Sequence, residues 1–161
     1  MGKKMMENEQ QLYLRAADIT DMDLLLQWAN DSTVRANAFS TAQIPYENHV
    51  EWFTAKLKDT DTYIYICMKE DIPIGQVRLD VEGNKAVIDY SISSEQRGHG
   101  YGKQMLQLVE AEVQQHLPQI QFFVAEVKKD NTASQKAFLA NDFEETFTTY
   151  EKTITKACYS L

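Results

Sequence analysis

Cysteine and proline are scarce in this chain of 161 residues, which contains two cysteines and three prolines. Cys67 and Cys158 lie far apart in apolar runs, with no C-x-x-C pair and no cluster of cysteine and histidine. A disulfide framework or a metal site is therefore not indicated, and we expect buried free thiols in a reducing cytoplasm. A catalytic thiol is the weaker alternative, because it needs an electropositive setting that a sequence does not reveal.

Long apolar runs are absent, and basic residues are in deficit. No run approaches the roughly 20 residues of a membrane-spanning helix. The first ten residues are charged and polar, so we expect no signal peptide and a disordered tail over residues 1–9. The 16 basic and 24 acidic residues give a net charge of -8. This balance argues against nucleic-acid binding and is compatible with a cationic substrate, although a solvated acidic surface is the simpler explanation.

Residues 10–161 are long enough for a single domain with its own core. Apolar patterns predict strands over residues 11–17, 63–68, 74–81, 86–93 and 122–127, and two more between 143 and 161. Helices are expected from Leu24 to Asn30, from Pro45 through Leu57, and over 101–117 and 131–141, with an irregular segment at 32–44. A meander followed by a strand-helix-strand crossover predicts an α+β fold with a mixed sheet and helices on its faces.

A glycine-rich stretch joins the strand 86–93 to the helix 101–117. Gly98, Gly100 and Gly102 stand at every second position there. A helix N-terminus leaves backbone N–H groups unpaired and favours negative charge, and glycine lets an anion approach the backbone closely. The stretch therefore predicts a cup of amides for an anion, and phosphate is the best fit.

Two familiar phosphate-binding loops do not match this stretch. A P-loop would need a glycine in place of Arg97 and a hydroxyl residue in place of Gln104. A dinucleotide fingerprint would need its third glycine at Lys103, one residue later than Gly102. For the glycine-rich stretch taken alone, an ordinary helix cap remains the alternative.

The run Arg97-Gly-His-Gly-Tyr-Gly102 resembles the pyrophosphate loop, Arg/Gln-x-x-Gly-x-Gly, of the GNAT superfamily of acyl-coenzyme A-dependent N-acetyltransferases. A second motif of that family, Asn-x-x-Ser/Ala followed four residues later by an aromatic residue, is matched by Asn131, Ser134 and Phe138. The order of elements also fits, so the resemblance covers nearly the whole chain. It implies a mixed, mostly antiparallel sheet of about seven strands with a splayed parallel pair, flanked by about four helices.

The resemblance implies acetyl-coenzyme A as co-substrate and no metal. Backbone groups of Tyr90, Ser91 and Ile92 would hold the pantetheine arm. The pyrophosphate would lie on the amides of Arg97, Gly98, His99, Gly100, Tyr101, Gly102 and Lys103. Asn131, Ser134 and Phe138 would lie on the far side of the ligand, although Asn131 equally fits a plain helix cap.

The catalytic groups depart from the family pattern. Family members commonly place a tyrosine where this chain has Phe138, and phenylalanine cannot donate a proton. They often place a glutamate near the start of the central strand, where this chain has Ala86. Ser134, Tyr90 and Tyr101 are the alternative acids, and Asp89, Glu82 and His49 are the alternative bases. Of these, Asp89, Ser134 and His49 are the candidate catalytic residues.

The first two expected helices should form the substrate side. Trp28-x-Asn30-Asp31 with Val34-Arg35, and His49-x-x-Trp52-Phe53, resemble GNAT proteins that acetylate nucleotide-linked aminosugars in pseudaminic-acid-type pathways. The likeness to ribosomal-protein and polyamine acetyltransferases is looser. The candidate substrate residues are Trp28, Asn30, Arg35, Phe39 and His49, with Arg35 suited to a nucleotide phosphate. Core packing is the simpler explanation for Trp28, Trp52 and Phe53.

We therefore expect a cytoplasmic, acetyl-coenzyme A-dependent N-acetyltransferase whose partner is a small amine, such as a nucleotide-linked aminosugar. A protein N-terminus or a polyamine is the alternative acceptor. A coenzyme A-binding sensor or interaction module without efficient catalysis is the alternative of another class. Neither membrane nor nucleic-acid partners are expected, and a homodimer is compatible with the sequence.

Overall fold

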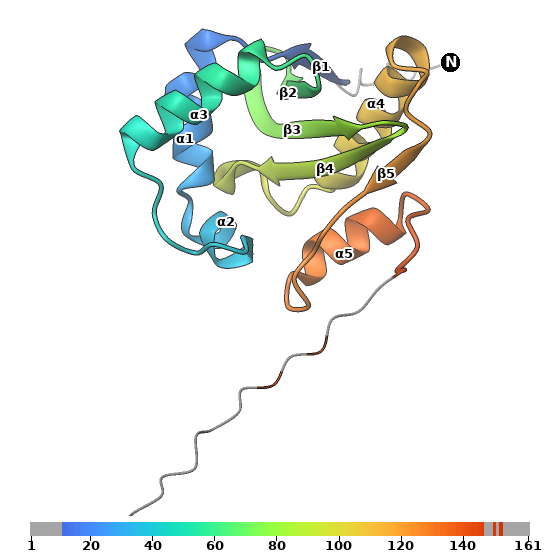
Figure 1. Ribbon diagram of the computed structural model, residues 1–161. Helices are drawn as coiled ribbons and strands as arrows, with labels where there is room; N and C mark the ends of the chain where they lie inside the picture. Colours follow the sequence, from blue (N-terminus) through green and yellow to red (C-terminus); the bar gives the residue numbers. More distant parts are fainter. Residues whose placement is uncertain (1–10, 147–149, 151, 153–161) are drawn as a thin grey trace, which may run out of the picture.

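The computed structural model of this protein describes residues 11–146, 150 and 152. In that part of the chain a five-stranded sheet lies between two groups of helices (Figure 1). The strands are β1 (Leu12–Ala16), β2 (Thr62–Lys69), β3 (Ile72–Glu82), β4 (Lys85–Ile92) and β5 (Phe122–Val124). They lie in chain order, with β1 to β4 antiparallel and β5 parallel to β4. The expected mixed sheet and α+β class are confirmed.

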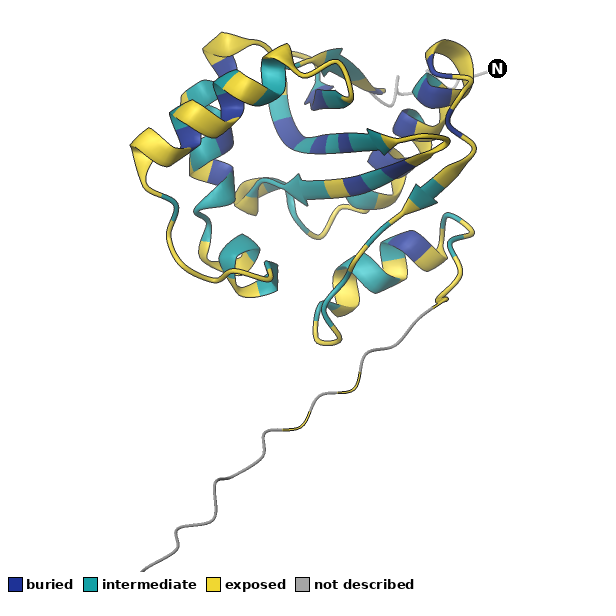
Figure 2. Ribbon diagram, in the orientation of Figure 1, coloured by how far each residue is buried: buried dark blue, intermediate teal, exposed yellow. Residues whose placement is uncertain are grey.

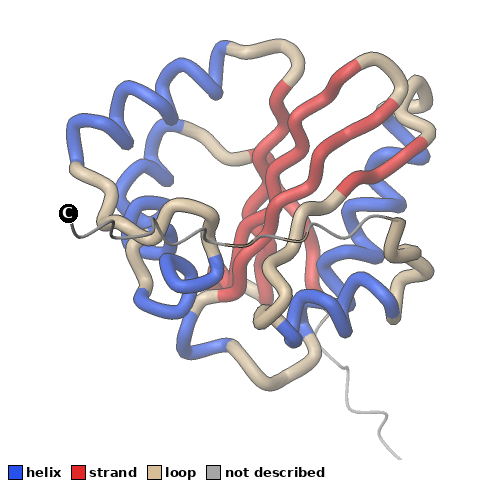
Figure 3. Tube along the Cα trace, turned by 60° about the horizontal axis from the view of Figure 1, so that its bottom comes forward, coloured by secondary structure: helices blue, strands red, loops and turns tan. Residues whose placement is uncertain are grey.

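The helices cover both faces of the sheet. They are α1 (Met22–Ala29), α2 (Ser32–Asn37), α3 (Tyr46–Lys58), α4 (Tyr101–His116) and α5 (Thr132–Leu139), with short 3-10 turns at Ile19–Asp21 and Ser94–Gln96. Figure 3 shows the strands between α1, α2 and α3 on one side and α4 and α5 on the other. Within the described residues, no helix is long and apolar enough to cross a membrane.

Two hydrophobic cores follow from the alternation of side chains along the strands. The larger core joins Cys67, Val77, Leu79 and Ile88 to α4, and the smaller one joins Ile64, Ile66 and Met68 to α1 and α3. The predicted apolar face of α4 is confirmed, because Leu106, Val109, Val113 and Leu117 are all buried. Figure 2 shows this burial concentrated on β3, β4 and the inner faces of the helices.

Cys67 is a buried free thiol, as expected. Burial raises its pKa to about 11, so the thiol stays protonated at neutral pH. Cys67 does not line the cavity described below, which argues against a catalytic thiol at this position. Cys158 lies outside the described residues.

Three expectations about elements need correction or stay open. The segment 32–44 was expected to be irregular, but it contains α2, whose N-cap Asp31 accepts hydrogen bonds from the amides of Thr33 and Val34. The strand expected over 122–127 ends at Val124. Residues 143–146 contain no strand, and the rest of the expected tail strands lies almost wholly outside the described residues, as does the tail 1–9.

Candidate active site

The glycine turn takes the conformation that the sequence predicts for an anion cup. Gly98 and Gly100 have φ values of 83° and 74°, in the left-handed region that side chains resist. Gly100 is the N-cap of α4, and neither glycine has a neighbour within 4 Å of the position a Cβ would take. The turn is therefore open on the side where the first amides of α4 lack helical partners. Its residues fit a diphosphate group.

The next feature is an opening between β4 and β5. The two strands pair only from Lys85–Val87 to Phe122–Val124, and beyond them β4 continues to Ile92 without a parallel neighbour. The expected splay is confirmed. Figure 1 shows β5 diverging from β4 toward α5.

Backbone alternation decides which groups of β4 face this opening. The amide of Ser93 donates to the carbonyl of Ile74 at 2.9 Å, so odd-numbered residues pair with β3. The backbone groups of Tyr90 and Ile92 therefore face the opening. The carbonyl of Ser91 instead lies against Gly75 on β3, which corrects the expectation that its backbone is available to a ligand.

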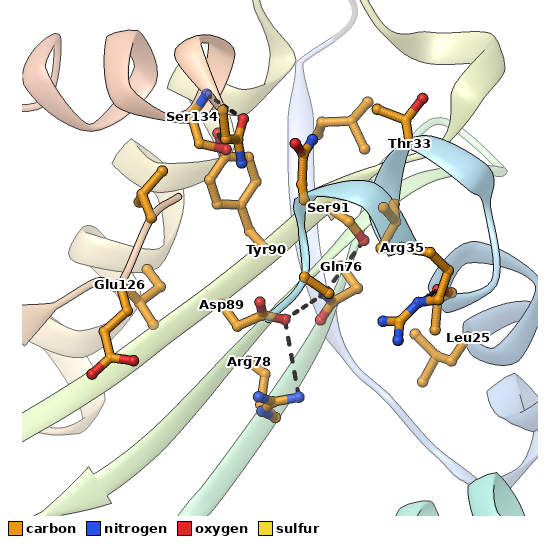
Figure 4. A pocket seen from close by; sticks show the side chains of 18 of the residues that line it. Leu25, Thr33, Arg35, Gln76, Arg78, Asp89, Tyr90, Ser91, Glu126 and Ser134 are labelled. Atoms are coloured by element: carbon orange, nitrogen blue, oxygen red, sulfur yellow. Dashed lines mark hydrogen bonds and ion pairs between the residues drawn. The ribbon is translucent and has the colours of Figure 1, made fainter. Parts of the chain in front are cut away.

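A cavity of about 610 Å³ lies along this opening and reaches between α1, α2, α3 and α5 (Figure 4). Ten of the predicted site residues line it: His49, Asp89, Ser134, Tyr90, Ser91, Ile92, Arg97, Asn131, Phe138 and Arg35. The predicted residues Gly98, His99, Gly100, Tyr101, Gly102 and Lys103 form the glycine turn that continues from Arg97. Trp28, Asn30 and Phe39 are not among the lining residues.

The wall formed by α5 carries the second family motif. Asn131 is the N-cap of α5, where its Oδ1 accepts the amide of Ser134 at 3.2 Å. The Asn131 amide nitrogen has no partner among the described residues and remains available to a ligand carbonyl. Tyr90 Oη donates to Ser134 Oγ at 3.2 Å, and the Tyr90 ring packs edge-on against Phe138 at 5.5 Å between centroids.

The floor of the cavity is polar where β3 and β4 face the first helices. Asp89 is the candidate base, and 55% of its side chain is exposed. Gln76 donates to it at 3.2 Å, while Arg78 lies 3.9 Å away and binds Asp80 more closely, at 2.8 Å. Asp89 therefore has only one weak cationic neighbour, and Figure 4 shows its carboxylate beside the opening.

The side chains of Arg35 and Asn30 form hydrogen bonds with backbone groups around α2. Arg35 donates from Nε to the Ala29 carbonyl at 2.5 Å and from a terminal nitrogen to the Ser40 carbonyl at 3.1 Å. Asn30 pairs with both the amide and the carbonyl of Ile44, at 2.8 and 2.9 Å. Both side chains thus fix the segment between α2 and α3, and within the Arg35 guanidinium Nη2 alone has no partner among the described residues.

The other predicted substrate residues differ in their positions. Trp28 is buried in the smaller core, and Phe39 is 70% exposed away from the cavity. His49 lines the cavity but is buried, stacked on Phe53, with Nε2 donating to the Met22 carbonyl at 2.9 Å. Burial lowers the pKa of His49, and the hydrogen bond to Met22 offsets only part of this effect. The imidazole is therefore neutral at pH 7.

Two polar contacts tie α2 across the cavity to later parts of the chain. Arg97 binds the Asp31 carboxylate at 2.6 Å, and Lys128 donates to the Ala36 carbonyl at 3.1 Å. Burial alone would raise the pKa of Asp31, but the hydrogen bond from Arg97 and the amides of α2 lower it overall. Arg97 also donates to the carbonyl of Ile92, so it connects β4, the glycine turn and α2.

Sequence reasoning missed several residues that line the cavity. They include Thr33, Asn48, Gln76, Arg78 and Glu126, and also Trp52, which was assigned to the core. Trp52 is 39% exposed and lies over the Arg78 guanidinium at 5.3 Å. One signal was available, because Gln76, Arg78 and Asp80 alternate with buried residues along β3. Within the described residues, no group of histidine, cysteine or carboxylate side chains could hold a metal ion.

Solved acetyltransferases share this fold. The structure superposes on a spermidine N-acetyltransferase from Vibrio cholerae in complex with coenzyme A and spermine, with a TM-score of 0.81, 17% identity, and 91% and 88% of the two chains covered. An aminoglycoside acetyltransferase in complex with coenzyme A and kanamycin gives 0.74, at 18% identity over 86% and 87%. An acetyltransferase from Salmonella typhimurium that modifies the N-terminal serine of ribosomal protein L7/L12 gives 0.69, at 20% identity over 81% and 78%.

No curated protein sequence is significantly similar to this chain. The sequence model of the GNAT acetyltransferase domain, however, matches residues 11–144, which include the glycine turn, both splayed strands and the α5 motif. This match spans most of the chain and agrees with the geometry of the cavity. The protein therefore belongs to the GNAT family of acetyltransferases.

Proposed function

We propose that this protein transfers an acetyl group from acetyl-coenzyme A to a primary amine of a small molecule, by direct attack of the amine on the thioester. The observation that carries the proposal is the open edge of β4 next to the left-handed glycine turn of α4. The turn suits a diphosphate and the edge suits an extended amide-bearing arm. The cavity supplies room for the amine beside both.

The residues present fit acetyl-coenzyme A. Amides of the glycine turn would hold the pyrophosphate, the backbone groups of Tyr90 and the amide of Ile92 would pair with the arm, and the free amide of Asn131 would bind one of its carbonyls. A backbone N–H at the opening of β4 would polarise the thioester carbonyl. What the bound ligand supplies is an acetyl group activated by a thiolate leaving group.

Asp89 is the residue we assign to deprotonating the amine. An amine with a pKa near 10 is only about one-thousandth neutral at pH 7, so a nearby carboxylate helps both to bind the ammonium and to take its proton. Asp89 lies on the cavity floor with a single distant cation, and Glu126 on the opposite side of the opening has no partner among the described residues. These two charges favour a cationic amine as the acceptor.

A nucleotide-linked aminosugar is the second candidate. The runs containing Trp28 and Asn30, and His49 and Trp52, support it by their likeness to enzymes of that class. Arg35 argues against this acceptor, because its side chain binds backbone carbonyls and this weakens the predicted contact with a phosphate. A protein N-terminus remains a further acceptor to test, because one structural neighbour acts on an N-terminal serine.

The test is an assay of free thiol released from acetyl-coenzyme A in the presence of separate amines: spermidine, an aminoglycoside, an aminosugar nucleotide and an N-terminal peptide. We expect thiol release with a cationic amine. In an Asp89→Asn variant, kcat/KM for that amine should be about 10- to 1000-fold lower. Thermal stabilisation by acetyl-coenzyme A should be unchanged in that variant. Stabilisation without turnover on any amine would instead favour a coenzyme A-binding module, and no stabilisation would refute the site.

A further inference from the structure

The cavity contains one side chain with the acidity to protonate a leaving thiolate. The lining carboxylates Asp89 and Glu126 are assigned to the amine, and guanidinium groups do not release a proton. The single N–H of neutral His49 already donates to the Met22 carbonyl. Tyr90 is the only phenol among the lining residues, and alkyl hydroxyls such as Ser134 are far weaker acids on their own.

Tyr90 is also held in a position to use its proton. Its hydroxyl donates to Ser134 Oγ at 3.2 Å, and its ring is fixed edge-on against Phe138. Figure 4 shows the Tyr90 ring pointing from β4 toward Ser134 on α5. Ser134 and Phe138 are four residues apart, about 6 Å along α5, so the two hydroxyls lie on the same wall as the ring of Phe138.

Ser134 is placed to pass this proton on. Its backbone amide is bound by Asn131 Oδ1, which fixes the first turn of α5 and with it the position of Ser134 Oγ. Its own hydroxyl proton has no acceptor among the described residues. Burial raises the pKa of Tyr90 more than the hydrogen bond to Ser134 lowers it, so the phenol is protonated at neutral pH.

We propose that Tyr90 and Ser134 form a two-hydroxyl proton relay to the leaving sulfur. This inference rests on the proposed acetyl transfer. As the amine nitrogen bonds to the acetyl carbon and the C–S bond breaks, Ser134 gives its proton to the sulfur and receives the proton of Tyr90. The phenolate regains a proton from water, and this balances the proton that the amine nitrogen releases.

Activity provides the first test, with the best amine from the panel. Tyr90→Phe and Ser134→Ala should each lower kcat about 10- to 100-fold, with the KM for acetyl-coenzyme A changed less than about threefold. The kcat of the double variant should be no lower than that of the slower single variant, because each substitution removes the same relay. Tyr13→Phe, which removes a phenol bonded to the Glu70 carbonyl outside the cavity, should match the wild type.

A hydroxyl added next to the relay gives a stricter test. Phe138→Tyr in the Tyr90→Phe background should restore at least a third of the lost rate, since it returns a phenol to the same wall. Additive losses in the double variant, or a rate for Tyr90→Phe within twofold of the wild type, would overturn the relay.

Binding of coenzyme A tests the relay without turnover. A thiolate that accepts a hydrogen bond from Ser134 is stabilised over the thiol, so affinity should rise from pH 7 to pH 9. We expect this rise, measured by calorimetry, to be at least threefold larger in the wild type than in Ser134→Ala. Equal pH dependence in the two proteins would overturn the relay. The protein could fail to acetylate any amine and still show this difference in pH dependence. That result would refute the proposed reaction but would support the contact between Ser134 and the sulfur of coenzyme A.

Discussion

Asp21 is a buried carboxylate that joins the first strand to the first helix. Arg15 on β1 binds both of its oxygens, at 2.8 and 2.9 Å, and the amide of Asp18 donates to it at 2.9 Å. The hydrogen bond from Arg15 is the main reason that the pKa of Asp21 is lowered, and it outweighs the opposite effect of burial. This contact orients the start of α1, from which Leu25 and Ala29 reach the cavity.

Replacing Asp21 by Asn should destabilise the protein by about 1–3 kcal/mol at pH 7. Because the pKa of Asp21 is depressed in the folded state, its contribution is present above the unfolded value near 4 and is lost as the pH falls through the lower folded value. Urea unfolding at pH 7, 5 and 3 should therefore show a gap between wild type and Asp21→Asn that narrows at pH 3. Asp130→Asn is the control, since that exposed side chain has no partner among the described residues. Equal losses in both variants would contradict the role of Asp21.

At the scale of elements, the turn between β4 and α4 combines two requirements in three residues. Its backbone must adopt left-handed φ values at Gly98 and Gly100, and the space beside it must stay open to a ligand. Gly102 meets a different limit, because a Cβ there would lie 3.3 Å from the ring of Tyr90. The turn thus serves both the anion cup and the packing of the proposed relay.

Gly100→Asp should abolish the thermal stabilisation by acetyl-coenzyme A, because it adds a side chain and a negative charge where the pyrophosphate is proposed to bind. The left-handed backbone should also cost about 1–2 kcal/mol of folding free energy. Gly83→Asp is a matched control, with φ of 62° in the β3–β4 hairpin and equally open surroundings. Both variants should melt earlier in thermal unfolding, but only Gly83→Asp should still respond to the ligand. A normal response of Gly100→Asp would refute the placement of the pyrophosphate.

Much of this arrangement was predictable, and the exceptions have physical reasons. The glycine turn and α4 carry local signals, a left-handed turn and a helical apolar face, which act within a few residues. Helix α2 has no buried face, because it has six residues and none of them is buried, and its local signal is limited to the N-cap Asp31. Arg35 was assigned to a phosphate because a sequence cannot reveal that three backbone carbonyls surround it.

At the scale of the whole molecule, the cavity divides its walls between two groups of helices. Residues of α1, α2 and α3 line the proposed amine side, and residues of α5 line the proposed coenzyme A side. The contacts Arg97–Asp31 and Lys128–Ala36 connect the groups across the opening. The chain as a whole carries a net charge of -8, which adds a long-range field to the local carboxylates.

Ionic strength should therefore affect the capture of a cationic amine more than its conversion. Raising salt from about 20 to about 300 mM shortens the Debye length several-fold, so kcat/KM for a multiply charged amine should fall several-fold. The value of kcat should change little, since the reacting groups lie inside the cavity. Steady-state kinetics at several salt concentrations measure both. An acceptor of net negative charge should show the opposite trend, and such a trend with high turnover would favour the aminosugar nucleotide.

The open edge of β4 has a consequence for the behaviour of the protein in a crowded solution. Unpaired strand edges on a protein surface recruit strands of other molecules and promote aggregation. Here the backbone groups of Tyr90 and the amide of Ile92 face a cavity walled by α2 and α5, while the Ile92 carbonyl already accepts a hydrogen bond from Arg97. The unpaired backbone groups of β4 can thus form hydrogen bonds with a small molecule without serving as a site for self-association.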